Sequence, residues 1–202
     1  MTSRSSSAPL ASRLAEVSGR LEPDLRGRLV ERATPLLDSG VETLDELHER
    51  LRVEPDPERL GELIWLAGWL GDPTVSGEPL RLLALEAADV ATRLTALNAL
   101  VSLRAANAPA VLREALRRDV HVAVRERAAM GLGEIEDGTA VDVLVALLED
   151  AGAPTPVRSA AAEGLGLIGD PAALDPLRRA ASDRAPDVAD DARQSIELIR
   201  GR

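Results

Sequence analysis

The sequence contains no cysteine, phenylalanine, tyrosine or lysine among its 202 residues. Without cysteine, the chain can form no disulfide, no thiolate nucleophile and no cysteine-ligated zinc site, and this usage fits a cytoplasmic protein. The only aromatic residues are Trp65 and Trp69, so the core must be built from leucine, alanine, valine and isoleucine. Side chains of this size favour thin layers of closely packed helices over one thick globular centre.

Positive charge is also scarce. All 24 basic residues are arginine, and 34 acidic residues outnumber them, which leaves a net charge of -10. This balance argues against binding to nucleic acid or to an anionic membrane, because both require a positive surface. The first nine residues lack the apolar centre of a secretory signal, and no apolar run reaches the roughly 18 residues of a membrane span. We therefore expect a cytoplasmic protein without a membrane segment.

The first part of the chain shows helical patterns without a common register. Residues 1–8 are polar and predict a disordered tail, and residues 9–56 predict a divergent N-terminal helical region. This helical region would contain a helix over 9–18, a helix from Pro23 that Pro35 interrupts or ends, and an amphipathic helix over 41–53. Asp56 and Pro57 suit the cap and first position of the next helix. No segment alternates with period two, so we expect no strands.

From Pro57 onward the chain repeats. Residues 92–103, 124–135 and 157–168 share one helical pattern, in which an arginine is followed by small residues and leucines. A degenerate copy precedes them and a half-copy follows. The last apolar residue of each copy falls at a spacing of 31 to 33 residues, at Leu70, Leu103, Ile135, Ile168 and Ile199. A constant period over five copies indicates a stack of similar units.

Each unit also predicts a second helix, whose inward side chains recur as Leu112, Ala115 and Leu116, then Leu144, Leu147 and Leu148, then Leu177, Ala180 and Ala181. Small residues in the first helices would let neighbouring helices approach closely: Ala99, Gly131, Gly164 and Ser195. One helix hairpin cannot bury both of its faces, whereas stacked hairpins form a continuous core. The last half-unit then serves as a cap.

These motifs resemble the HEAT-repeat family, in the short bacterial variety known from phycobilin lyases. The resemblance rests on Val124-Arg125 to Ile135 and on Val157-Arg158 to Pro171, and it covers roughly residues 57–200. It implies an all-α fold, a right-handed α-solenoid of helix hairpins over 57–202 that ends in a capping helix. It also implies that second helices line a concave surface. Such repeats serve scaffolds, adaptors, lyase subunits and some nucleic-acid enzymes, so the resemblance names no single function.

Several residues could suggest chemistry, but each has a structural interpretation. Arg93, Arg125 and Arg158 recur in register, which predicts a ladder of bonds to the adjacent turns. The run Gly164 to Gly169 fits a dinucleotide-binding motif by letter, yet it lies within a helix and follows no strand. His48 and His121 belong to no metal-binding motif. We therefore expect no catalytic residue, no metal and no cofactor.

The tryptophans lie one helical turn apart and share a face. Either residues 9–53 cover them, or they form an exposed patch for a partner or for self-association. The expected protein-binding residues are these two and the outward positions of the second helices: Trp65, Trp69, Arg81, Arg113, Glu114, Arg117, Asp142, Val145, Glu149, Asp175, Arg178 and Arg179.

The sequence thus predicts a non-enzymatic adaptor or scaffold that binds another protein along its concave face. The alternatives are an enzyme subunit or chaperone of the phycobilin-lyase type and a DNA-glycosylase-like helical repeat. The partner and the oligomeric state stay open.

Overall fold

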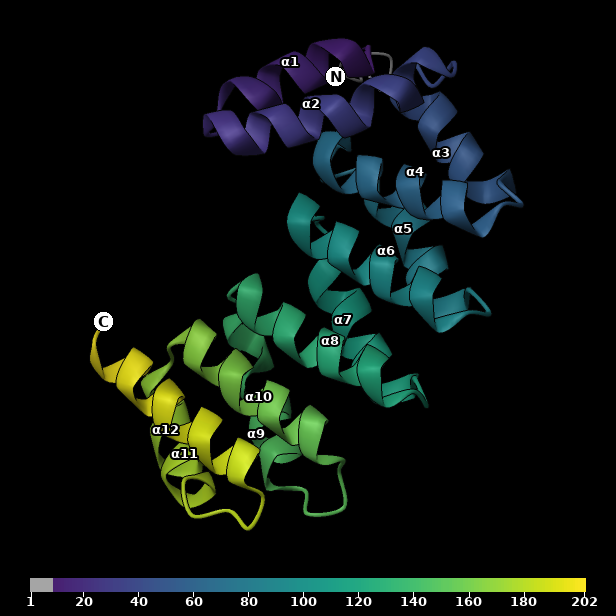
Figure 1. Cartoon of the computed structure of the whole chain (residues 1–202). Helices are drawn as coiled ribbons and strands as arrows, with labels where there is room; N and C mark the ends of the chain where they lie inside the picture. The colour runs from purple at the N-terminus through teal and green to yellow at the C-terminus, as the bar shows by residue number, and fades with distance from the viewer. Residues whose placement is uncertain (1–8) are drawn as a thin grey trace, which may run out of the picture. The chain divides into compact units, whose positions relative to one another are not determined.

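The computed structural model describes residues 9–202; the predicted tail at residues 1–8 lies outside this range. Within it the chain forms twelve α-helices and two short 3-10 helices, and no strand beyond one isolated bridge between Pro9 and Thr43 (Figure 1). The α-helices are α1 (Leu10–Gly19), α2 (Pro23–Asp38), α3 (Leu44–Val53), α4 (Pro57–Leu70), α5 (Gly77–Glu86), α6 (Val90–Leu103), α7 (Ala108–Arg118), α8 (Val122–Glu134), α9 (Val141–Glu149), α10 (Thr155–Ile168), α11 (Leu174–Ala180) and α12 (Pro186–Arg200).

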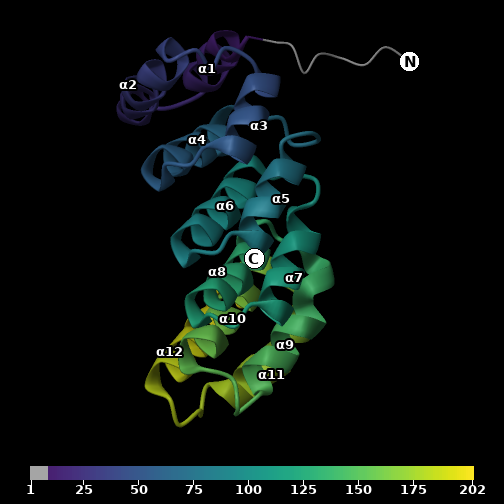
Figure 2. The ribbon, with the colours of Figure 1, turned by 90° about the vertical axis from the view of Figure 1, so that its right-hand side faces the viewer.

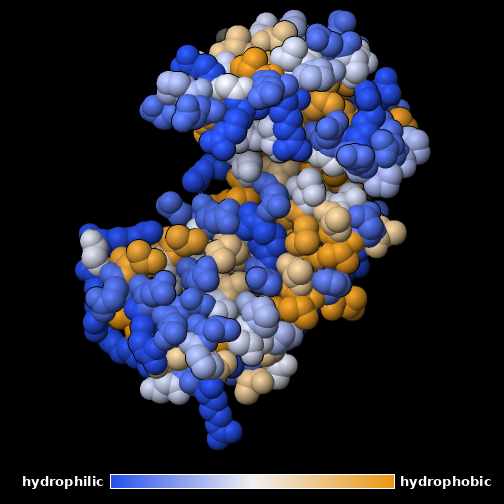
Figure 3. Space-filling model, in the orientation of Figure 1, coloured by the Kyte–Doolittle hydropathy of each residue, from blue (hydrophilic) through white to orange (hydrophobic). Residues whose placement is uncertain are grey.

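The chain divides into two compact units, unit 1 over Met1–Asn107 and unit 2 over Ala108–Arg202. The division falls inside the repeats, between α6 and α7. The regular spacing of the repeats did not predict a division there. No helix of the described residues is long and apolar enough to span a membrane. In the space-filling view, hydrophobic side chains appear in separate patches among hydrophilic ones (Figure 3).

Unit 2 consists of two layers of helices. The first helices α8, α10 and α12 pack one on the next, while α7, α9 and α11 form the other layer (Figure 2). Its buried aliphatic side chains are leucine, alanine, valine and isoleucine, as the scarcity of aromatic residues requires. The repeating pattern therefore predicted both the helices of this unit and their buried faces.

Glycine sets the distance between the first helices. A Cβ atom placed on Gly133 of α8 would lie 2.5 Å from the Cα atom of Gly164 in α10. A Cβ atom on Gly166 would lie 2.5 Å from the hydroxyl oxygen of Ser195 in α12. The predicted roles of Gly164 and Ser195 are confirmed, but the sequence did not identify Gly133 and Gly166 as the residues that face them.

Unit 1 combines the start of the repeat with the N-terminal helices. α4 packs on α6, where a Cβ atom on Gly68 would lie 2.9 Å from the Cα atom of Ala99, and α5 packs on α6. α3 contacts both α4 and α5. The guanidinium of Arg13 in α1 donates to the carbonyl oxygens of Leu70 and Gly71 at 2.5 Å each. α1 is therefore tied to the C-terminal end of α4.

Two predicted helix boundaries were wrong. α2 continues through Pro35 to Asp38 rather than ending there. Pro35 lies three residues from the end of the helix, so its missing N–H removes one hydrogen bond near a terminus. The helix predicted from Val41 begins at Leu44, because Thr43 and Glu46 form a capping box. The predicted start of α4 is confirmed, with Asp56 accepting from the Glu58 amide.

Candidate functional site

The first candidate site is the outward face of α7, α9 and α11 in unit 2, called here the second-helix surface. In α7 the predicted inward residues Leu112, Ala115 and Leu116 are buried. Arg117 is exposed and Arg113 is half-buried on the opposite face. The equivalent outward positions on α9 and α11 are exposed or half-buried as well: Asp142, Val145, Glu149, Asp175, Arg178 and Arg179. The helical register therefore placed these side chains correctly.

Most of the charges on this surface pair with one another. Arg113 of α7 forms an ion pair with Asp137, in the turn before α9, and bonds the Thr139 hydroxyl. Arg179 of α11 pairs with Glu149 of α9 at 2.5 Å. Both contacts join one hairpin to the next, and the Arg113 pair, the less exposed of the two, contributes more to holding the stack together. Sequence reasoning had assigned Arg113, Glu149 and Arg179 to partner binding alone.

Two further pairs are local to one helix. Arg178 pairs with Asp175 within α11, and Arg118 pairs with Glu114 within α7. Exposed pairs of this kind contribute little to stability, because both charges stay hydrated. A partner could therefore exchange them for its own charges at low cost.

Two apolar residues of α9 that lie three positions apart, Val143 and Ala146, are neighbours on its outward face. Val143 of α9 is 39% exposed, Val145 is half-buried and Ala146 is exposed. Among the described residues, Arg117 of α7 and Asp142 of α9 form no ion pair. Of these three residues only Val145 was among the predicted binding residues; the equivalent of Val143 in α7, Val111, is buried, so the two second helices do not expose the same positions.

The predicted site residue of unit 1 on a second helix is Arg81 of α5. It pairs with Glu78 at 2.9 Å in the same helix and with Glu86 at 3.9 Å. The hydrogen bond from Arg81 lowers the pKa of the Glu78 carboxyl. Arg81 is therefore held by its own helix.

The repeated arginines form the predicted ladder. Arg93 donates to the carbonyl oxygen of Ala87 at 2.8 Å, Arg125 to that of Leu116 at 3.2 Å, and Arg158 to that of Leu148 at 3.0 Å. Each guanidinium thus bonds a carbonyl at or just beyond the end of the preceding second helix, which has no partner inside that helix. Arg158 pairs in addition with Asp183 in the following turn.

The histidines lie apart, and the described residues contain no group of three His, Cys, Asp or Glu that could hold a metal ion. His121 lies exposed in the turn before α8. His48 of α3 is buried, and its Nε2 atom lies 2.8 Å from the hydroxyl oxygen of Ser76, which is itself fully buried and accepts from the Asp72 amide. This network joins α3 to the start of α5.

Burial of His48 predicts a pH dependence of stability. Burial lowers the pKa of His48 from its ordinary value of 6.5, against the opposing effect of Asp45. A histidine with a lowered pKa stabilises the fold fully above about pH 6.5, and this contribution declines as the pH falls toward the folded-state pKa. Urea unfolding should show wild type losing stability between pH 7.5 and pH 5.5, while His48→Gln changes less. Parallel curves for the two proteins would contradict the prediction.

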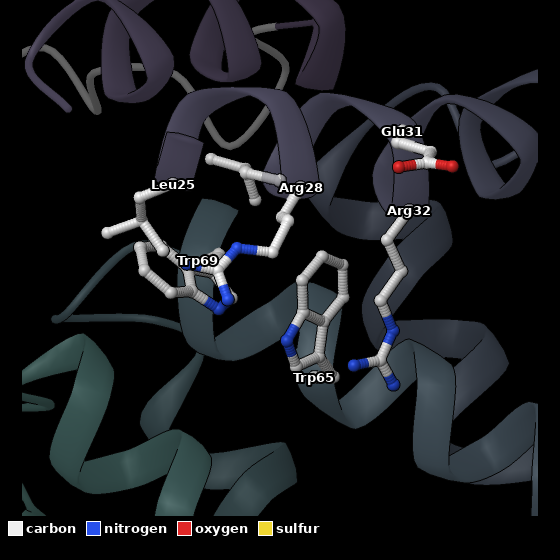
Figure 4. Close-up of a pocket in the computed structure, with 7 residues that line it drawn as sticks. Leu25, Arg28, Glu31, Arg32, Trp65 and Trp69 are labelled. Carbon is white, nitrogen blue, oxygen red and sulfur yellow. The ribbon is translucent and has the colours of Figure 1, made fainter. Parts of the chain in front are cut away.

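The second candidate site is a pocket between α2 and α4 in unit 1, called here the tryptophan pocket. Its volume is about 510 Å³, and its lining residues are Leu25, Arg28, Leu29, Glu31, Arg32, Trp65 and Trp69 (Figure 4). The centroids of the two indole rings lie 6.5 Å apart, with their planes at 53°. The guanidinium carbon of Arg32 lies 4.3 Å from the centroid of the Trp65 ring.

The N-terminal helices cover the tryptophans only in part. α2 contributes five of the lining side chains, so residues 9–53 do reach the indole rings, yet Trp65 and Trp69 each stay half-buried. Sequence reasoning had placed both tryptophans among the binding residues. It missed Arg28 and Arg32, because α2 belongs to no repeat register and its position on α4 could not be inferred.

A second hollow lies among the first helices of unit 2 and is acidic. It encloses about 390 Å³, and its lining residues include Glu126, Glu163, Asp187, Asp190 and Asp191. Burial, together with Asp191 and Glu126, raises the pKa of the Glu163 carboxyl. Asp190 pairs with Arg193, and Asp191 accepts from the Ser159 hydroxyl. The carboxylates of this hollow are therefore partly engaged by the helices that carry them.

Comparison with known proteins supports the repeat architecture. Residues 109–197 match the family model described as HEAT repeats. This range lies within unit 2 and confirms the predicted resemblance there. No curated protein sequence matches the chain.

Several solved structures share the fold. Human deoxyhypusine hydroxylase in complex with glycerol is 22% identical, with a TM-score of 0.57 over 96% of this chain and 74% of that one. The complex of CpcE and CpcF of phycocyanin lyase from Nostoc sp. PCC7120 is 22% identical, with a TM-score of 0.62 over 78% of this chain and 65% of that one. A designed armadillo repeat protein in complex with the peptide (KR)4 is 18% identical, with a TM-score of 0.55 over 94% and 91%. At these identities the likeness establishes the fold alone, and it confirms the all-α class of HEAT-like helix hairpins.

Proposed function

We propose that the chain is a non-enzymatic interaction module that binds a segment of a protein partner on the second-helix surface of unit 2. The observation that carries the proposal is the exposed apolar pair of Val143 and Ala146 on α9, on the same surface as Arg117 and Asp142, two charges without an ion pair among the described residues. Around it, Arg113 and Arg179 are engaged between hairpins. Paired charges around a small apolar centre suit a peptide that brings one apolar side chain and flanking charges.

The architecture supports the same proposal. Stacked hairpins present their second helices as an extended surface, and this is the surface that repeat proteins use for binding. The designed armadillo repeat neighbour is a complex with a peptide, which makes peptide binding a reasonable use of such a fold. The proposed partner is a peptide segment that carries an apolar anchor residue.

Changing Val143 to aspartate should abolish the binding of a partner peptide. Peptides selected from a displayed random library on the wild-type protein should bind Val143→Asp at least tenfold more weakly, because the new carboxylate would be buried against the apolar anchor. Binding can be measured by titration calorimetry. Far-UV circular dichroism should stay unchanged, since the substituted side chain is exposed.

Val122→Asp is the matched control. Val122 begins α8 in the same unit and is 37% exposed, close to the 39% of Val143, but it lies on a first helix. Selected peptides should bind this variant as tightly as wild type. Peptides that bind Val143→Asp undiminished would show that the second-helix surface is the wrong site. Arg113 is a poor choice for such a test, because its reversal would also break the pair with Asp137.

A further inference from the structure

The tryptophan pocket combines an apolar wall with two cations. Leu25, Leu29, Trp65 and Trp69 supply the apolar side, and Arg28 and Arg32 extend over it from α2 (Figure 4). A volume of about 510 Å³ falls within the 300 to 1,000 Å³ that is usual for ligand sites. The half-buried state of both tryptophans leaves their rings within reach of a partner.

The two guanidinium groups retain unused donors. Arg32 rests with its guanidinium carbon 4.3 Å from the Trp65 centroid and forms no ion pair among the described residues. The hydrogen bond of Arg28 runs from Nε to the carbonyl oxygen of Asp24 at 3.4 Å, which leaves its terminal N–H groups. In Figure 4 the guanidinium of Arg32 points toward Trp65, and the Glu31 carboxylate lies at the opposite end of that side chain.

The geometry defines what would fit. A guanidinium whose carbon lies over an indole ring is attracted by the ring face without using its N–H groups, which stay available for a carboxylate. An arginine and a carboxylate can form two parallel hydrogen bonds. The tryptophans favour an aromatic ring beside that carboxylate, because ring pairs gain from offset or edge-to-face contact. The ligand should therefore carry a carboxylate and an aromatic ring side by side.

Charge limits the ligand to one negative group. The pocket holds two arginines and one glutamate, whereas the chain as a whole carries a net charge of -10. A polyphosphate or a run of acidic residues would be repelled by the surrounding field, but a single carboxylate matches the single excess positive charge.

We propose that the tryptophan pocket binds a peptide segment in which an aromatic residue stands next to one aspartate or glutamate. This inference rests on the proposed function, that the chain binds protein segments, and it adds a second contact in unit 1 with a stated chemistry. A peptide is the occupant because the open, half-exposed tryptophans accept a side-chain pair while the remainder of the ligand stays outside.

The chain provides its own probe for this proposal. Trp65 and Trp69 are its only aromatic residues, so its intrinsic fluorescence reports on this pocket alone. Acetyl-Gly-Phe-Glu-Gly-amide contains no fluorophore that competes, and its titration should change the fluorescence in a saturable way. Acetyl-Gly-Phe-Gln-Gly-amide and acetyl-Gly-Leu-Glu-Gly-amide should each bind at least tenfold more weakly, because one lacks the carboxylate and the other lacks the ring.

Variants assign the binding to the pocket. Arg32→Gln should remove the preference for glutamate over glutamine, whereas Arg20→Gln should keep it. Arg20 is the matched control, an exposed arginine that pairs with Glu16 away from the pocket. Circular dichroism establishes that both variants are folded. A preference that survives Arg32→Gln, or equal binding of the glutamate and glutamine peptides, would overturn the proposal.

Two further outcomes separate this inference from others. Phenylacetate binding as tightly as the peptide would overturn the peptide assignment in favour of a small aromatic acid. Failure of the Phe-Glu peptide, while library-selected peptides still lose binding in Val143→Asp, would remove the pocket and leave the proposed function standing. Binding of the Phe-Glu peptide by both wild type and Val143→Asp would support the pocket independently of the second-helix surface.

Discussion

Replacing Gly133 with valine should lower the free energy of unfolding of unit 2 by about 3 kcal/mol. A Cβ atom at this position would lie 2.5 Å from the Cα atom of Gly164 and 2.9 Å from its carbonyl oxygen. Both atoms belong to the backbone of α10, so no side chain can turn away, and α8 and α10 must separate. Urea unfolding followed by circular dichroism would measure the loss.

The same substitution at Gly27 is the control. Gly27 lies in the second turn of α2, and a Cβ atom there would meet nothing within 4 Å. Valine forms helix better than glycine by roughly half a kcal/mol, so Gly27→Val should be neutral or slightly stabilising. Equal losses for Gly133→Val and Gly27→Val would mean that close approach of the two helices is not what requires glycine.

The contact between Gly133 and Gly164 shows how far the sequence predicts the fold. The repeat period identified the helices of unit 2 and their buried faces, because burial recurs with the same spacing in every copy. It also marked Gly164 and Ser195 as contact residues. It did not pair Gly164 with Gly133, since the period aligns equivalent positions while contacts between helices join positions that are not equivalent.

The candidate sites were harder to predict from the sequence than the fold. Helical register placed Arg113 and Arg179 on the outward face, which is correct, but their pairing with Asp137 and Glu149 depends on the offset between hairpins. The sequence placed both tryptophans among the expected binding residues. Their neighbours Arg28 and Arg32 could not be placed there, because α2 has no counterpart among the repeats from which a docking position could be read.

The arginine ladder leads to the second large effect. Arg158→Ala should lower the free energy of unfolding of unit 2 by about 2 kcal/mol, which is below the values for fully buried pairs because some exposure remains. The Arg158 side chain is 12% exposed and that of Asp183 is 18% exposed. The substitution removes the bond to the Leu148 carbonyl oxygen and leaves Asp183 without its cation. Urea unfolding at neutral pH would measure it.

Arg178→Ala is the matched control in the same unit. Arg178 also pairs with an aspartate, Asp175, but the two side chains are 50% and 76% exposed, so the loss should stay below about 0.5 kcal/mol. Acid titration adds a second readout. The hydrogen bond from Arg158 lowers the pKa of Asp183 from its ordinary 3.8, so the pair stabilises the fold above that pH and is lost as the pH falls through the folded-state pKa. Arg158→Ala should therefore flatten the acid dependence while Arg178→Ala preserves it. Indistinguishable variants would argue that the repeated arginine is kept for a role other than joining successive hairpins.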